Sequence, residues 1–548
     1  MVLQRVLKYS VRSLFVLSCL FGGFQTMAQS QSMELEANDL LSPAFHAGRR
    51  EAMRQLMPDH SVAVIFSFPE RTFSNDVSYV YHQNPNLYYL SGYIEPDAVL
   101  LLFKDMQQDS ANHSYNEIMF VRKRNAAREQ WAGRRLGVEG TKTKLGFTDV
   151  YNGEDFAKFP INFNKFSSVL YDVFPDDISE SSAAGDLSAL IHSFKEKIGV
   201  PSSEGKLLQE DMVAIVRSKN ATQFSRVITR ISDRKELEGY KGNPIVDQLL
   251  SKPDSLQLQA ISASLNTKYS SLITFSDIMG KLREIKTPEE LNLLRKSVEI
   301  SSIAHLEGMR AVTPKTSERE LEGILTYVHK KYGAEGEGYP PIVGAGQNGC
   351  ILHYIENSAP AINNQLLLAD VGSEYHGYSA DVTRTYPANG KFTPEQKAIY
   401  QLVYDAQEEI FKLCKEGVPF ASLNEKAKEI LSNGLIKLGI ISKASEVSKY
   451  YMHGCSHHMG LDVHDKNSSA VLKENMVITV EPGIYIAKGS PCDPKWWDIG
   501  VRIEDDVVIG KTSCENLSKG APRSVEAIEK ALAEKSLFNQ FKFPALSN

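Results

Sequence analysis

Cysteine is scarce in this chain, which has only six among 548 residues. The six follow no regular spacing, so a framework of several disulfides is excluded. If the chain is exported, it could still form one disulfide, and the sequence does not say which cysteines would form it. The six are Cys19, Cys350, Cys414, Cys455, Cys492 and Cys514.

An excess of positive charge is also missing, since the formal net charge is -6. The chain therefore offers no basic surface for a polyanion, and we expect no nucleic-acid partner. A hydrophobic content of 42% and a charged content of 23% are typical of a soluble globular protein. The length exceeds what one hydrophobic core organises and predicts about two to four domains.

Long apolar runs are absent except near the start, where Ser13 to Phe24 follows three basic residues. Small residues ending at Ala28 come next, so we predict a signal peptide over residues 1–28 and a periplasmic or secreted mature chain. The run is shorter than the roughly 20 residues that span a bilayer, which argues against a membrane anchor. Lipidation at Cys19 is an alternative that its sequence context fits poorly.

Strand-like and helical stretches alternate in the first half of the chain. The apolar runs 61–66, 97–103 and 117–121 predict strands. We therefore predict an α/β N-terminal domain over residues 29–275. Its last part, near 205–275, is polar and helical, and the sequence suggests no chemistry for it.

A second domain is predicted over residues 276–548. Thr287 is placed as the N-cap of a long helix, Pro288 takes the first helical position, and Glu290 completes a capping box. A helix from about 317 to 331, helices near 394–440 and intervening strand-like runs indicate an α+β domain with antiparallel hairpins.

Four carboxylates and one imidazole of this second domain stand in apolar or glycine-rich runs. Burying an unpaired carboxylate costs several kcal/mol, so four carboxylates at one place need compensating positive charge. Two divalent cations would supply four positive charges. These residues, Asp370, Asp381, His457, Glu481 and Glu504, therefore suggest a two-metal hydrolase.

Asp370 and Asp381 belong to a predicted hairpin of two strands, 365–371 and 381–386. A turn centred between Tyr375 and His376 would place the two aspartates directly opposite each other. Like charges at such a position destabilise a strand pair. A bound cation removes that objection.

The other candidates share local features of the same kind. Four histidines lie between residues 453 and 464, Pro-Gly directly follows Glu481, and Arg502 and Glu504 are expected on one face of a strand. The glycine run 344–349 imitates a dinucleotide fingerprint, but residues 350–355 read as a strand where that motif needs a helix. No serine lies in a nucleophile elbow, so a Ser-His-Asp triad is unsupported.

These motifs together closely resemble the Xaa-Pro aminopeptidases (aminopeptidase P), a family of pita-bread metallopeptidases. The resemblance covers the second half almost continuously and reaches into the first half. The segments that carry it are Gly344–Lys391, His453–Asp465, Glu481–Gly483, Arg502–Asp506, Asn86–Pro96 and Gln130–Gly137.

The resemblance implies an α/β N-terminal domain, a pita-bread catalytic domain with an antiparallel sheet, and release of the N-terminal residue from peptides with proline in second position. It implies two divalent metal ions, with manganese favoured and cobalt, iron or zinc as substitutes, and a homo-oligomer, either dimer or tetramer. Asp381 and Glu504 would bridge the two ions. The implied metal ligands are Asp370, Asp381, His457, Glu481 and Glu504, the catalytic residues His353, His464 and Glu481, and the substrate-binding residues Tyr339, His453, Arg502 and Tyr88. Tyr88 matches an aromatic residue that, in the family, can reach the pocket of a neighbouring subunit.

Two rival functions stay open at this point. A prolidase that cleaves only Xaa-Pro dipeptides would share the ligands. Ser456, directly before His457, matches the aminopeptidase motif, whereas prolidases usually have glycine at this position. A scaffold that has lost its metals and only binds peptides is the second rival. All five implied ligands are present, which argues against it.

Overall fold

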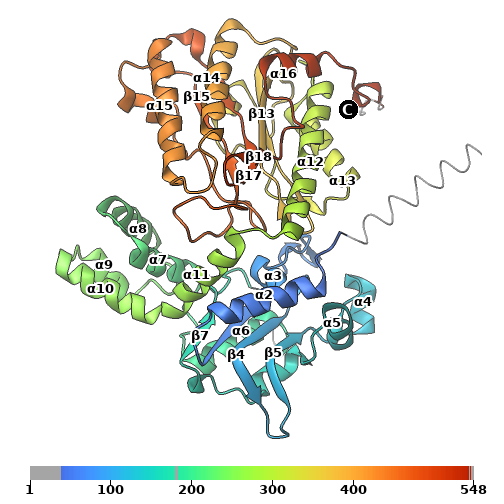
Figure 1. Ribbon diagram of the computed structural model, residues 1–548, viewed down its shortest axis with the longest axis vertical. Helices are drawn as coiled ribbons and strands as arrows, with labels where there is room; N and C mark the ends of the chain where they lie inside the picture. The colour runs from blue at the N-terminus through green and yellow to red at the C-terminus, as the bar shows by residue number, and fades with distance from the viewer. Residues whose placement is uncertain (1–38, 179–182, 542–543, 545–548) are drawn as a thin grey trace, which may run out of the picture.

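A computed structural model describes residues 39–178, 183–541 and 544. The N-terminal half and the C-terminal half form two bodies, one above the other in Figure 1. The predicted signal peptide and Cys19 lie outside the described residues. Among the described residues, no helix is long and apolar enough to cross a membrane.

The N-terminal domain is built on one five-stranded mixed sheet in the order β6-β5-β4-β1-β7. Strand β1 lies inside the sheet, antiparallel to β4 and parallel to β7. All of its residues are buried, and alternate side chains enter hydrophobic clusters on the two faces of the sheet. All three predicted strands are confirmed. The sheet consists of β1 Ser61–Phe66, β4 Val99–Gln108, β5 Ser114–Val121, β6 Val150–Asn152 and β7 Ser168–Tyr171.

Helices and a small hairpin surround this sheet. Figure 1 shows α2 and α3 on the side that faces the C-terminal domain. The hairpin of β2 and β3 is exposed. These elements are α2 Pro43–Leu56, β2 Thr72–Ser74, β3 Val77–Ser78, α3 Pro85–Ser91, α4 Ala126–Ala132, α5 Gly137–Leu145, η1 Gly153–Lys158, η2 Phe163–Lys165 and α6 Leu187–Ile198.

The segment near 205–275 is helical, as predicted. Leu208, Met212 and Ile215 of α7 enter the hydrophobic cluster on one face of the sheet, so this segment is packed structure. Its last helix continues to Glu284 and runs through the predicted domain boundary at residue 275. The helices are α7 Lys206–Arg217, α8 Ala221–Arg234, α9 Pro244–Leu250, α10 Ser255–Lys268 and α11 Ser270–Glu284.

Helices of the C-terminal domain enclose its strands, with α14 and α15 on one side and α12 and α13 on the other (Figure 1). The predicted capping box is present, because Glu290 Oε2 accepts from Thr287 N at 2.9 Å and Thr287 Oγ1 accepts from Glu290 N at 3.4 Å. The helices are α12 Pro288–Ala311, α13 Glu318–Lys331, α14 Pro394–Phe411, α15 Ala421–Lys437 and α16 Val525–Leu532, with the short turns η3 Gly346–Cys350, η4 Ala444–Lys449, η5 Pro494–Trp496 and η6 Phe538–Gln540.

Every paired strand of the C-terminal domain is antiparallel to its neighbour, in the part of the chain that the structure describes. The predicted antiparallel hairpins are therefore confirmed. The strands are β8 Gly336–Glu337, β9 Ile342–Ala345, β10 Leu366–Val371, β11 Ser373–Tyr375, β12 Tyr378–Ser379, β13 Val382–Pro387, β14 Val477–Val480, β15 Gly483–Ile486, β16 Ile499–Arg502, β17 Asp505–Ile509 and β18 Cys514–Asn516.

Two local predictions are wrong. The turn of the aspartate hairpin lies one residue later than expected, with Tyr375 paired to Tyr378, so Asp370 faces Thr383 instead of Asp381. Residues 350–355 are not a strand, because a 3-10 turn ends at Cys350 and an irregular loop follows. No α-helix opens after the glycine run, so the dinucleotide fingerprint lacks its helix in the structure as well.

Candidate metallopeptidase site

All five predicted ligands line one pocket of about 290 Å³ in the C-terminal domain. They come from four separate parts of the chain, and the fold brings them together. Asp381, His457 and Glu504 lie close enough that one ligand atom from each falls within 4.8 Å of the other two. The lining residues are Leu352, His353, Asp370, Asp381, His453, Gly454, Ser456, His457, His464, Glu481, Arg502 and Glu504.

Asp370 and Asp381 lie diagonally across the hairpin of β10 and β13. Because side chains alternate along a strand, the shift of two residues from the predicted register keeps both on the same face. The hydroxyl of Tyr339 lies 2.5 Å from Asp370 Oδ1 and 2.7 Å from Asp381 Oδ1, and the two carboxylates share its one proton. One phenol therefore holds both carboxylates in place.

His457 and Glu481 are positioned by strand β14. Thr479 Oγ1 of that strand accepts from His457 N at 3.1 Å, and the Thr479 amide donates to the His457 carbonyl at 2.9 Å. Glu481 directly follows the strand, before Pro482. His457 Nε2 lies 3.3 Å from Asp381 Oδ2 and 3.7 Å from Glu481 Oε1, so the imidazole faces both carboxylates.

Glu504 and Arg502 lie on one face, as predicted, although the strand is interrupted between β16 and β17. Thr383 Oγ1 donates to Glu504 Oε2 at 2.6 Å and accepts from Arg502 Nε at 3.1 Å. Arg502 Nη2 also donates to Asp370 Oδ2 at 2.6 Å. The buried guanidinium therefore neutralises part of the carboxylate cluster.

The positive groups around the carboxylates do not balance the negative charge of the cluster, and the pKa values reflect this. Burial, followed by repulsion from the neighbouring carboxylates, raises the pKa of Glu504 well above its usual range. Burial likewise raises the pKa of Asp370, although Arg502 opposes the shift, and it raises that of Glu481 to about 7. Burial lowers the pKa of His457, but the contact with Asp381 outweighs it and brings the value to about 9. Four carboxylates and one imidazole packed this closely are a ligand set that suits divalent cations.

Three further predicted residues, His353, His453 and His464, line the same pocket. His464 packs edge-on against His457 with ring centroids 4.3 Å apart. His453 Nε2 lies 2.8 Å from the Tyr485 hydroxyl, and burial lowers the pKa of His453 to about 4. This imidazole is therefore neutral near pH 7.

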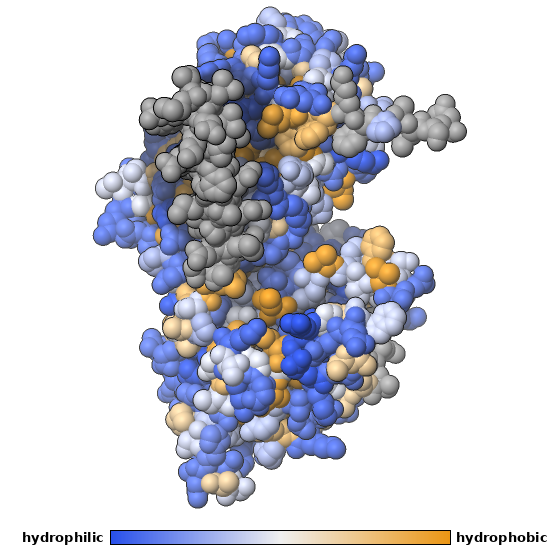
Figure 2. All heavy atoms as spheres, turned by 90° about the vertical axis from the view of Figure 1, so that its right-hand side faces the viewer, coloured by the Kyte–Doolittle hydropathy of each residue, from blue (hydrophilic) through white to orange (hydrophobic). Residues whose placement is uncertain are grey.

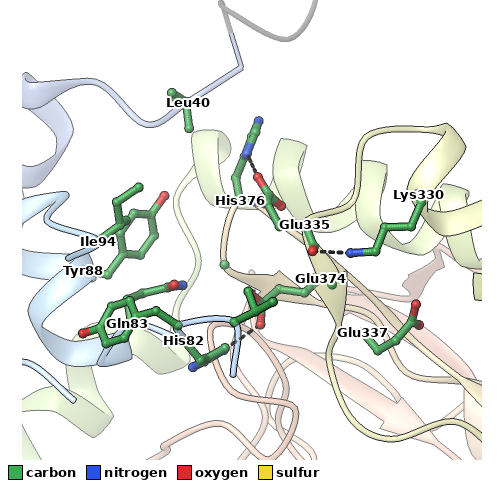
Figure 3. Close-up of a pocket in the computed structure, with 14 residues that line it drawn as sticks. Leu40, His82, Gln83, Tyr88, Ile94, Lys330, Glu335, Glu337, Glu374 and His376 are labelled. Atoms are coloured by element: carbon green, nitrogen blue, oxygen red, sulfur yellow. Dashed lines mark hydrogen bonds and ion pairs between the residues drawn. The ribbon is translucent and has the colours of Figure 1, made fainter. Parts of the chain in front are cut away.

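Tyr88 lies in another part of this chain, and its contact with substrate in the pocket of a neighbouring subunit stays a prediction. It is buried and lines a second cavity of about 500 Å³ between the two domains, together with Ile94 and Glu374. Figure 3 shows its ring among side chains of the N-terminal domain, across the cavity from the hairpin that carries His376. Within this chain, Tyr88 does not line the carboxylate pocket.

Sequence reasoning missed several polar residues that hold the site together. Tyr485 Oη accepts from Arg502 Nη1 at 2.8 Å, and Asp506 Oδ2 accepts from Asp381 N at 2.9 Å. The fully buried Arg384 donates to the carbonyls of Thr383 and Glu504 at 2.9 and 2.7 Å. Thr383 is the one missed residue that the sequence could have indicated. It lies two residues after Asp381, so its side chain must lie on the same face of the strand.

Comparisons with known proteins agree with this geometry. Residues 292–511 match the model of metallopeptidase family M24, and residues 46–170 match the N-terminal domain of aminopeptidase P. The Xaa-Pro aminopeptidase of Escherichia coli is 33% identical over 493 residues, which cover 88% of this chain and 96% of that protein. The chain belongs to the Xaa-Pro aminopeptidase family.

Solved structures of this family share the fold. Escherichia coli aminopeptidase P with the inhibitor Pro-Leu has a TM-score of 0.67 and 31% identity, covering 90% of this chain and 98% of that one. A Pseudomonas aeruginosa aminopeptidase has a TM-score of 0.68 and 29% identity over the same shares. The chain is therefore a metallopeptidase with the N-terminal and pita-bread domains of the aminopeptidase P family.

Proposed function

We propose that this protein removes the N-terminal residue from peptides whose second residue is proline. The observation that carries the proposal is the convergence of five ligand-type residues with His353, His453, His464 and Arg502 in one pocket. The named relatives across nearly the whole chain support the same activity. A dipeptide-only prolidase is not favoured by these relatives.

Asp370, Asp381, His457, Glu481 and Glu504 would hold two divalent cations. When bound, these ions would lower the pKa of a water molecule and polarise the scissile carbonyl. Glu481 faces the pocket, and its Oε2 lies 3.4 Å from His453 Nδ1. We infer that it moves a proton from the attacking water to the proline nitrogen.

The pocket histidines supply hydrogen bonds to the reacting carbonyl. Burial lowers the pKa of His464, so its imidazole stays neutral and can donate one N–H to the developing oxyanion. His353 lines the same pocket from the loop after η3. His453 is fixed by Tyr485 and would contact the proline ring, while Tyr339 acts through the two aspartates.

The test is manganese-dependent hydrolysis of Xaa-Pro-Yaa-Zaa peptides and of Xaa-Pro dipeptides by the wild type and by Asp381→Asn. We expect the longer peptides to be cut, and activity to be lost in Asp381→Asn because a central carboxylate is neutralised. Asp233→Asn, which alters an exposed aspartate on α8, should retain full activity. Cleavage of dipeptides alone would favour a prolidase, and full activity of Asp381→Asn would refute the metal site.

Export belongs to the same proposal. The basic, apolar and small residues of 1–28 support a signal peptide, and hence a periplasmic or secreted mature protein. N-terminal sequencing of the protein recovered from the periplasm or medium should find a new start after about Ala28. An intact Met1 on cytoplasmic protein would contradict export.

We also propose manganese as the native metal, because hard oxygen ligands with one imidazole suit it. Metal analysis of protein purified without added ions should find two manganese ions per chain. A different metal would refute this assignment and leave the peptidase proposal standing.

A homo-oligomer completes the proposal. Apolar side chains are exposed on the N-terminal domain, and Figure 2 shows such side chains at the surface near the junction of the domains. Contacts between copies of the chain would cover them. Light scattering should give a dimer or tetramer, and a monomer would contradict it. The residues are Phe73, Val77, Tyr79, Val80, Ile94 and Trp131.

A further inference from the structure

Two cysteines that are far apart in the sequence lie side by side in the C-terminal domain. Cys414 follows helix α14 and Cys514 begins strand β18. The Sγ of Cys414 lies 3.4 Å from the carbonyl oxygen of Ile410, and the Sγ of Cys514 lies 3.7 Å from that of Phe411. Both thiols therefore contact adjacent carbonyls in the last turn of the same helix.

The backbone holds the two segments together independently of the thiols. Lys415 forms a bridge with Gly510, and the amide of Glu416 donates to the Gly510 carbonyl at 3.0 Å. Cys514 itself pairs with Ile509 across strands β17 and β18. The two cysteines are thus neighbours because of the fold.

The two thiols also interact with each other. Interaction with Cys514 and burial raise the pKa of Cys414, and interaction with Cys414 lowers the pKa of Cys514. Cys414 is fully buried, whereas Cys514 is partly exposed. Cys514 is therefore the thiol that an oxidant can reach.

We propose that Cys414 and Cys514 form a disulfide when the protein meets a disulfide oxidant. The Cys514 thiolate attacks one sulfur of the oxidant, forming a mixed disulfide and releasing one reduced thiol. Cys414 then loses its proton, attacks the Cys514 sulfur and releases the second thiol. Two protons leave the protein, and its two electrons reduce one oxidant disulfide to two thiols.

The proposal does not depend on peptidase activity. It rests on the proposed export only for an oxidising environment, because disulfides persist mainly outside the cytoplasm. Cys455 is the competing partner, since it lies near enough to influence Cys414. Cys455 is buried as well, so neither thiol of that pair is open to an oxidant.

The bridge would close the segment from residue 414 to residue 514, which contains His457, Glu481 and Glu504. It would tie the end of α14 to β18, the neighbour of the strand that follows Glu504. Closing a loop of this length restricts the unfolded chain strongly, so we expect the oxidised form to melt at a temperature roughly 5–10 °C higher.

The experiment treats the mature wild type with oxidised glutathione and counts free thiols in denaturant. Mass spectrometry of an unreduced digest then identifies any linked peptides. We expect the loss of two thiols, one peptide pair joining Cys414 to Cys514, and a melting temperature that dithiothreitol lowers. In Cys514→Ala, the thiol loss and the response to dithiothreitol should both disappear.

Cys492→Ala is the matched control, because it removes a partly exposed cysteine that is not part of the pair and should behave as wild type. Melting under dithiothreitol checks that each variant folds. An unchanged thiol count, or a linked peptide joining Cys414 to Cys455, would overturn the proposal. Hydrolysis of proline peptides is measured separately. A failure of the proposed function would therefore not change the interpretation of the disulfide experiment.

Discussion

Replacing Arg384 by methionine should destabilise the C-terminal domain, because it breaks a buried ion pair. Arg384 is fully buried, and its guanidinium donates to Asp505 Oδ1 at 2.7 Å, to the Glu504 carbonyl at 2.7 Å and to the Ala521 carbonyl at 3.1 Å. Removing one partner of a buried ion pair costs about 3–5 kcal/mol, because the other charge stays desolvated. We expect a loss of that size in Arg384→Met.

Arg310→Met is the matched control at the surface. Arg310 pairs with Glu307 at 2.6 Å and with Glu534 at 2.5 Å, but the pairs are partly exposed. Exposed pairs contribute about 0–1 kcal/mol. Urea unfolding, followed at a probe of the C-terminal domain, measures both variants. Unfolding free energies that agree within about 1 kcal/mol would refute the reasoning.

A double variant separates the unpaired charge from lost packing. Arg384→Met with Asp505→Leu removes both charges, so it should recover part of the stability that the single change loses. Activity gives an independent readout, since Arg384 holds the carbonyls of Thr383 and Glu504. Folded Arg384→Met should bind metal less tightly, whereas Arg310→Met should not.

Three further predictions concern pH, glycine and the aspartate pair. Burial lowers the pKa of His46 to about 4, against about 6.5 in an unfolded chain, so the unfolded state gains a proton first as the pH falls. His46 alone should therefore lower the free energy of unfolding by about 2 kcal/mol between pH 7.5 and pH 5. Urea titrations at the two pH values should show a smaller drop in His46→Gln. The drop in the exposed His192→Gln should equal that of the wild type. Gly372→Ala should abolish activity, because its Cβ would lie 1.8 Å from the carbonyl oxygen of Ala380, between β12 and β13. Gly48→Ala, in open space on α2, should instead raise the unfolding free energy by about 0.5–1 kcal/mol. Tyr339→Phe removes the hydroxyl that both aspartates accept from, and should lower kcat/KM by about 10–100-fold in peptide hydrolysis, so wild-type kinetics would contradict its role.

Much of the fold could be predicted because it depends on neighbours in the sequence. The capping box that begins α12 needs only Thr287, Pro288 and Glu290, and the structure contains it. Buried strands such as β1 and β10 are mostly apolar, so composition indicates them. The family motifs likewise pointed to five side chains that line one pocket.

Side-chain direction was predictable where strand pairing was not. The hairpin between Asp370 and Asp381 turns one residue later than expected, and each cross-strand partner changes by two. Both aspartates still face the pocket, because side chains alternate with a period of two. Which residue faces Asp370 depends on where the chain closes its turn, and the apolar pattern does not record that position.

The sequence by itself determined the ligand-type residues, the helix starts and the strands, because each depends on residue type and local spacing. Only the tertiary structure decided that Tyr485 and Arg384 support the site, that Tyr88 lines a different cavity, and that Cys514 is the neighbour of Cys414. Those relations join segments far apart in the chain. They arise from packing and backbone pairing across the whole domain, which no local pattern encodes.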